Sequence, residues 1–203
     1  LSVIGRDKQS KDWLCWAHAW VQDDVTRNRK EIAERLRDFE REGDLTISED
    51  AKADVMQFCD MIKKVHDTGL IPAENGIGLD PASITTIVDE LAARGIHTAE
   101  NGGPIVGAKQ SALALSPSIW GLERKLKDGT FWHAGQPMMA WCVSNAKAEQ
   151  RGNAVLITKQ TAGKAKIDPL VATFNAVMLM SRNPIASLVS SPWDDPSFSL
   201  VSE

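Results

Sequence analysis

Apolar and polar positions along the chain follow two periods, one typical of strands and one of amphipathic helices. The segments 1–5 and 13–21 are apolar and flank a polar turn, which predicts two paired strands with 13–21 in the sheet interior. Within 25–42, apolar side chains recur three and four positions apart among many charges, which predicts one amphipathic helix.

Further along, the pattern alternates between strands and helices, as in a parallel α/β unit. The segment 101–107 is expected to be a glycine-rich loop, and the apolar segment 138–143 follows Pro137. His133 is expected just before a strand. In chain order we predict an edge strand at 45–47, a helix at 51–68, a strand at 77–79, a helix at 83–94, a strand from 96, a helix at 117–127, two antiparallel strands joined at 150–153 (the second at 154–158), and a helix from 168 to about 181.

The 203 residues predict one folded domain, 1–182, and an extended tail, 183–203. The tail is rich in Ser and Pro. Its apolar side chains, Trp193, Phe198 and Leu200, are candidates to anchor it to a partner or to fold it back onto the domain. Because the chain begins at Leu1 without Met, inside an expected strand, we expect it to be a portion of a longer protein.

Composition is that of an ordinary globular protein, with 43% hydrophobic and 25% charged residues. No apolar run approaches the roughly 20 residues of a membrane span, so no membrane association is predicted. The three cysteines form no C-x-x-C pair, and we expect buried free thiols in a reducing cytosol. The four histidines are scattered without metal-binding spacing, which argues against zinc.

Charge is distributed unevenly although the net charge is only −4. Between positions 101 and 170 there are nine Lys or Arg against four Asp or Glu, a local balance of +5, so the rest of the chain carries −9. A basic region suits a substrate that bears phosphates, whereas an ordinary solvated surface is the alternative.

Two acids, Asp80 and Asp168, stand in similar settings at the ends of predicted elements. Each precedes a proline and a predicted helix, so each has a simple alternative role as a helix cap. A carboxylate at such a position also suits a hard divalent cation, which needs few protein ligands and leaves room for water and phosphate. We therefore take both acids as candidate metal ligands and catalytic residues.

The segment before Asp168 carries three lysines, Lys159, Lys164 and Lys166, which are candidates to contact DNA phosphates, with a solvated loop as the alternative. Motifs for nucleotide phosphates and for serine hydrolases are absent from the sequence, and no P-loop is predicted.

Taken together, IGLDPAS and the later succession H-x-G-x-P, W, N, K and K-I-D-P resemble the C-terminal nuclease domain of tailed-phage terminase large subunits, especially the HK97-like branch. The resemblance covers roughly 1–182. It implies an α/β, RNase H-like fold, with a mixed central sheet flanked by helices. It also implies two Mg²⁺ or Mn²⁺ ions held by acids, with Asp80 matching the middle acid and Asp168 the last.

The first acid of that family lies on the opening strand, just ahead of a segment similar to Leu1-Ser2. The resemblance therefore implies a truncated first strand and a first acid upstream of this chain, together with the family's ATPase domain. It further implies double-stranded DNA, a portal and a small terminase subunit as partners, and the host cytoplasm as location. The expected activity is metal-dependent cutting of concatemeric genome DNA.

Two other functions are kept open. One is a different RNase H-like nuclease, such as a junction resolvase. The other is a non-catalytic docking domain of the packaging motor, in which Asp80 and Asp168 serve only as helix caps.

Overall fold

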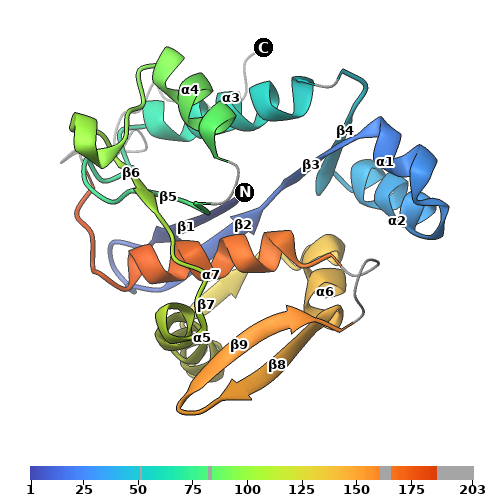
Figure 1. The fold of residues 1–203 in the computed structure, drawn as a ribbon. Helices are drawn as coiled ribbons and strands as arrows, with labels where there is room; N and C mark the ends of the chain where they lie inside the picture. The colour runs from blue at the N-terminus through green and yellow to red at the C-terminus, as the bar shows by residue number, and fades with distance from the viewer. Residues whose placement is uncertain (51, 82–83, 161–165, 187–203) are drawn as a thin grey trace.

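The computed structural model describes residues 1–50, 52–81, 84–160 and 166–186, which fold into a mixed α/β architecture. Figure 1 shows α7 (Asp168–Met180) running across the middle of the molecule, with α3 (Ala53–Asp67) and α4 (Thr85–Ala93) above it and α5 (Ala112–Lys127) below. The predicted helix from 168 is thus confirmed, and it lies at the centre of the fold.

A three-stranded mixed sheet packs against α7. Its strands are β1 (Ser2–Arg6), β2 (Trp13–Ala17) and β7 (Phe131–His133), in the order β1-β2-β7. β2 is antiparallel to β1 and parallel to β7. This confirms the predicted strand pair and puts β2 in the sheet interior, because its aromatic and apolar residues suit a strand with neighbours on both sides.

The predicted strand at 13–21 is interrupted at His18. β3 (Ala19–Gln22) follows this break and pairs in parallel with β4 (Leu45–Ser48), which confirms the predicted strand at 45–47. The single helix expected at 25–42 is wrong in one respect, since α1 (Asp23–Asn28) and α2 (Lys30–Arg41) are separated at Arg29. Arg29 has φ −117° and ψ 69°, outside the helical region, so the backbone turns there although the apolar spacing continues.

The α/β unit is confirmed with a different second strand. β5 (Ile77–Leu79) lies where it was predicted, but it pairs in parallel with β6 (Ile105–Gly107), inside the segment expected to be a loop. The strand expected from 96 is wrong: Thr98 makes one isolated bridge to Ile105, and a 3₁₀ turn, Ala99–Asn101, follows. The chain reverses tightly there, since a Cβ on Gly103 would lie 2.0 Å from the carbonyl oxygen of His97.

Two further boundaries differ from prediction. α5 begins at Ala112 rather than at Pro117, because Ser111 is its N-cap and accepts a hydrogen bond from the amide of Ala114. Pro117 therefore lies within the helix. The segment 138–143 is part of a helix, α6 (Pro137–Ser144), so His133 ends β7 and does not precede a strand.

The remaining strands form a two-stranded antiparallel hairpin, β8 (Ala146–Arg151) and β9 (Ala154–Lys159), as predicted. The pair packs on α5, where the buried hydroxyl of Ser116 accepts a hydrogen bond from the amide of Val155 at 2.7 Å.

Buried apolar side chains form two clusters that α7 holds together. The first surrounds Leu170, Phe174 and Val177 of α7 with residues of α2, α5 and α6, and the second lies around β5, β6, α3 and α4. β5 approaches α7 closely, since a Cβ on Gly78 would lie 3.0 Å from Leu179 Cδ1. Glycine at this position therefore lets the second cluster pack against the helix that anchors the first.

Most of the predicted tail, residues 187–203, lies outside the described residues, and the division at 182 stays a prediction. The first residues of the predicted tail, which the structure does describe, contact the domain. Arg6 donates hydrogen bonds to the side-chain oxygen of Asn183 and to the carbonyl of Pro184. Among the described residues, no helix has both the length and the apolar character needed to cross a membrane.

Candidate functional site

Asp168 is the first residue of α7, held by a backbone that is itself buried. Its neighbours Ile167, Pro169 and Leu170 are buried in the core, whereas Asp168 is exposed. Among the residues that the structure describes, none forms a hydrogen bond or ion pair with its carboxylate. The core thus fixes the position of Asp168, and its carboxylate remains available to a ligand.

Electrostatics identify what lies near Asp168. Burial lowers the pKa of the Leu1 amino group to about 6, and the nearby carboxylate of Asp168 opposes that change. Burial also raises the pKa of the Cys142 thiol to about 12, and the negative charge of Asp168 adds to this effect. Asp168 therefore lies within electrostatic reach of the start of β1 and of α6.

Hydrogen bonds position the start of β1 on α7. The hydroxyl of Thr173, in the second turn of α7, donates to the carbonyl of Pro169 and lies 3.1 Å from Ser2 Oγ. The Leu1 amino group donates to the carbonyl of His18 at 2.9 Å. These contacts hold the first residues of β1 beside the first turns of α7.

Asp80 directly follows β5 and is exposed, next to the buried Leu79. The interpretation of Asp80 as a helix cap is wrong, because α4 begins at Thr85 with Ile84 as its N-cap. Asp80 lies instead at the carboxyl end of a strand in a parallel pair, where open α/β sheets commonly bind ligands.

The beginning of β1 connects the surroundings of the two acids. The Leu1 side chain packs against the cluster that contains Ile77 and Leu79 of β5, while the charge of Asp168 acts on the pKa of the Leu1 amino group. Figure 1 agrees, with the N-terminus drawn near the tip of β5 and above α7. Both predicted acids thus belong to elements that pack around Leu1.

The lysine segment is tied down at both ends by Asn145, which the sequence analysis did not single out as a site residue. The carbonyl of Asn145 accepts from the amide of Gln160 at 2.8 Å, and its side-chain amide donates to the carbonyl of Lys166 at 3.1 Å. Lys159 is exposed at the end of β9, and Lys166 is half-buried two residues before Asp168. Lys164 lies outside the described residues.

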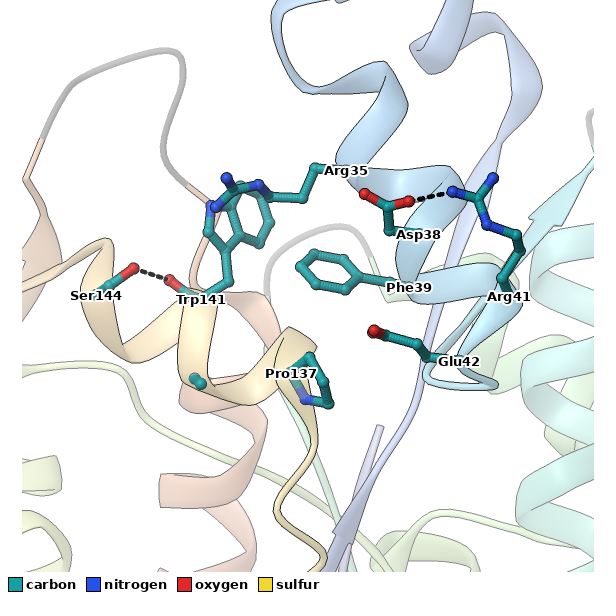
Figure 2. Close-up of a pocket in the computed structure, with 9 residues that line it drawn as sticks. Arg35, Asp38, Phe39, Arg41, Glu42, Pro137, Trp141 and Ser144 are labelled. Atoms are coloured by element: carbon teal, nitrogen blue, oxygen red, sulfur yellow. Dashed lines mark hydrogen bonds and ion pairs between the residues drawn. The ribbon is translucent and has the colours of Figure 1, made fainter.

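Neither candidate acid lines the surface hollow between α2 and α6, which has a volume of about 560 Å³. Figure 2 shows Phe39 facing Trp141 and Asp38 paired with Arg41. The ring centroids of Phe39 and Trp141 are 5.5 Å apart. Trp141 borders this hollow, while Cys142, the next residue of α6, belongs to the buried core near Asp168. Since neither candidate acid lines the hollow, we do not place the chemistry there.

Asp80 and Asp168 fit a hard divalent cation, because both offer carboxylate oxygens from exposed positions on a well-packed backbone. In the described part of the chain, no group of three or more His, Cys, Asp or Glu residues is arranged to hold a metal by itself. His133 is exposed, and its Nδ1 accepts a hydrogen bond from the amide of Gly135 at 3.1 Å, which accounts for it without a metal.

Comparison with known proteins is consistent with this geometry. The family described as "Terminase large subunit, endonuclease domain" matches residues 17–183. Among curated proteins, "Protein YmfN" of Escherichia coli (strain K12) is 27% identical over 165 residues, which cover 78% of this chain and 34% of that protein. Among solved structures, the crystal structure of the HK97 bacteriophage large terminase has a TM-score of 0.68 at 20% identity, covering 86% of this chain and 35% of that one.

The chain thus spans about a third of the length of the relatives that it matches. The structural similarity confirms the predicted RNase H-like fold. The family match covers most of the chain, including β5, the hairpin and α7. The chain therefore belongs to the family of terminase large subunit endonuclease domains.

Proposed function

We propose that this chain is a metal-dependent DNA endonuclease domain that cuts concatemeric phage genomes during packaging, by two-metal hydrolysis of phosphodiester bonds. The observation that carries the proposal is the setting of Asp168. A carboxylate that is fixed by buried neighbours, exposed, and without a hydrogen bond among the described residues is better suited to bind a ligand than to stabilise the fold.

Asp80 and Asp168 would hold the cations from two separate elements, the end of β5 and the start of α7. Two Mg²⁺ or Mn²⁺ ions held there would supply an activated water and stabilisation of the leaving 3′ oxygen. A third acid would lie just upstream of Leu1, whose backbone nitrogen is within electrostatic reach of the Asp168 carboxylate. This arrangement would bring three acids around the same phosphate.

Lys159 and Lys166, with Lys164 between them, would contact the DNA backbone next to these acids. Lys159 and Lys166 flank a segment whose two ends are hydrogen-bonded to Asn145. Lys166 lies two residues ahead of Asp168. Charge on such a segment attracts phosphates without distinguishing bases, so recognition should be largely independent of sequence.

The decisive experiment compares Asp168→Asn with a matched control, Asp24→Asn, in the longest natural polypeptide that carries this chain. Asp24 is also an exposed acid in the first turn of a helix, α1. Because metal ions contribute several kcal/mol of charge stabilisation, we expect Asp168→Asn to lower Mn²⁺-dependent plasmid cleavage by roughly a hundredfold or more. Asp24→Asn should cleave as the parent does.

A second readout does not depend on activity. Calorimetric titration with Mn²⁺ alone should show weaker binding for Asp80→Asn and Asp168→Asn, with circular dichroism unchanged. Cleavage that continues in EDTA would refute the metal mechanism.

The two rival functions give different results in the same assays. A non-catalytic docking domain predicts that Asp168→Asn leaves cleavage by the whole protein unchanged. A junction resolvase predicts strong preference for branched over linear duplex DNA, whereas a packaging nuclease should cut linear duplexes.

The proposed activity implies partners and a location. We propose that the domain acts on double-stranded DNA in the host cytoplasm, joined to an upstream ATPase domain, with a portal and a small terminase subunit. Co-purification of these proteins with the full-length polypeptide from infected cells tests this assignment.

A further inference from the structure

One face of the β1-β2-β7 sheet carries exposed apolar side chains. Val3 pairs with Trp16, Gly5 with Leu14, and Leu14 with Trp132, so these residues lie in rows across the three strands. Because successive side chains of a strand point to opposite faces, this is the face opposite to that of the buried Trp13 and Phe131.

These rows border a groove with a volume of about 400 Å³, which Val65 of α3 lines as well. Leu14 is 53% exposed and Trp132 is 58% exposed. Gly5 leaves its part of the groove open, since a Cβ there would meet nothing within 4 Å. The volume lies within the range of pockets that hold compact ligands, roughly 300–1,000 Å³, so the groove can accept aromatic side chains.

The described chain ends beside an edge strand of this sheet. The Arg6 guanidinium, on the face of Trp13 and so on the other side of the sheet from the groove, donates hydrogen bonds to the Asn183 side chain and, at 3.2 Å, to the Pro184 carbonyl. Because β1 is at the edge of the three-stranded sheet, the chain beyond these residues can pass around it to the groove. From Ala186, the last described residue, Trp193 is seven positions away. Seven extended residues reach roughly 23–25 Å, which is long enough to pass around one edge strand, since neighbouring strands lie only about 5 Å apart.

Composition matches the segment to the groove. Residues 187–203 contain Trp193, Phe198 and Leu200, three acids and no Lys or Arg. The turn beside the groove carries Lys8 and Lys11 as well as two acids. These charges are engaged within the turn, since Asp7 accepts from the amides of Gln9 and Ser10, Asp12 accepts from the Trp132 indole, and the Lys11 amino group donates to the carbonyl of Lys8. The match therefore rests on the apolar side chains of the segment.

We propose that residues 187–203 bind in cis to the apolar groove formed by Val3, Gly5, Leu14, Trp16 and Trp132, with the Trp193 indole as the main anchor. Burial of an aromatic side chain removes roughly 150–250 Å² of surface from water, which favours an occupant of this kind. The contact with Arg6 lowers the entropic cost of binding, because it holds the start of the segment at β1, the strand that contributes Val3 and Gly5 to the groove. The proposal is independent of nuclease activity.

The test uses the full chain labelled with 5-fluorotryptophan, with each ¹⁹F resonance assigned by Trp→Phe substitution. In the parent, the Trp193 resonance should be shifted from that of a free 187–203 peptide and should show little solvent isotope effect. Leu14→Asp should return the Trp193 resonance to the free-peptide position, and Trp193→Ala should shift the Trp132 resonance.

Leu113→Asp is the matched control, because Leu113 is 81% exposed on α5, away from the groove. It should leave the Trp193 resonance unchanged, and Trp120 on α5 should keep its resonance in every variant. Circular dichroism shows whether Leu14→Asp keeps the fold of the parent. If it does not, Trp132→Ala provides a second way to alter the groove.

Three outcomes would overturn the proposal. A free-peptide Trp193 resonance in the parent would show that the segment does not bind the domain. A bound resonance that persists in both groove variants would place it elsewhere. A shift that depends on protein concentration would assign the groove to a second copy of the chain.

Discussion

Asn145 offers a prediction about how the lysine segment is positioned. Its side-chain amide donates to the carbonyl of Lys166 at 3.1 Å, and its own carbonyl accepts from the amide of Gln160 at 2.8 Å. Asn145→Ala removes the first bond and retains the second, because the second uses only the backbone. The substitution therefore releases one end of the segment that leads to Asp168.

The magnitude follows from one partly buried hydrogen bond. Such a bond contributes about 1 kcal/mol, within a range of roughly 0.5–1.5 kcal/mol. A difference of that size changes an equilibrium about fivefold. If cleavage requires the Lys166 end to be held, Asn145→Ala should lower the cleavage rate by up to about fivefold and the free energy of unfolding by about 1 kcal/mol.

Two measurements check this prediction. Hydrogen exchange by the amides of 166–170 should accelerate, and plasmid cleavage in Mn²⁺ should fall as stated. Gln160→Ala is the matched control, because its side chain donates only an exposed bond to the Ala146 carbonyl. Exchange and cleavage at the parent's level would refute the reasoning, and a loss as large as that of Asp168→Asn with the fold intact would assign Asn145 a direct role in the chemistry.

Three further predictions concern the core. Ser116→Ala leaves both backbone groups of Val155 without their buried partner, which lies 2.7 Å from the amide and 3.0 Å from the carbonyl, so urea unfolding should show a loss of about 1–3 kcal/mol; an unchanged midpoint would contradict it. Phe174→Ala, at a side chain only 6% exposed, should lower the free energy of unfolding by about 3–5 kcal/mol, and a loss below 1 kcal/mol would mean that the site collapses around the cavity. Because burial raises the pKa of Cys142 to about 12, its thiol should resist alkylation at pH 8 until the chain unfolds. Because the thiol stays protonated in the native state, the free energy of unfolding is unaffected below the unfolded thiol's pKa of roughly 8.5 and falls as pH rises from there toward the native pKa. Cys142→Ala should lose less stability over that pH range, and an equal loss would contradict the prediction.

The sequence predicted elements best where local pattern and termination signals agree. β5 was predicted at its observed bounds because a short apolar stretch is followed by Asp80-Pro81. By contrast, α5 begins ahead of the predicted start at Pro117, because proline is common at the first position of a helix and the cap at Ser111 is evident only in the structure. The apolar run in α6 has no clear period, so a helix and a strand cannot be separated by pattern alone.

For the candidate site, the sequence identified the acids but not what surrounds them. Asp80 and Asp168 were found because each ends or begins an element. That Leu1 lies near Asp168 is a contact between distant parts of the chain, which no local spacing encodes. Asn145 was missed because an Asn at a helix end is commonly only a cap, and its bond to Lys166 depends on tertiary structure.

The course of α7 has a mechanical consequence. One end of this unbroken helix presents Asp168, and three residues beyond its other end Asn183 is clamped by Arg6. At 1.5 Å per residue, the helix is a rod of roughly 20 Å. A protein that pulls on the chain beyond position 184 would have to break the hydrogen bonds of Arg6 before the force reached α7. Until those bonds break, the pulling force would not displace Asp168.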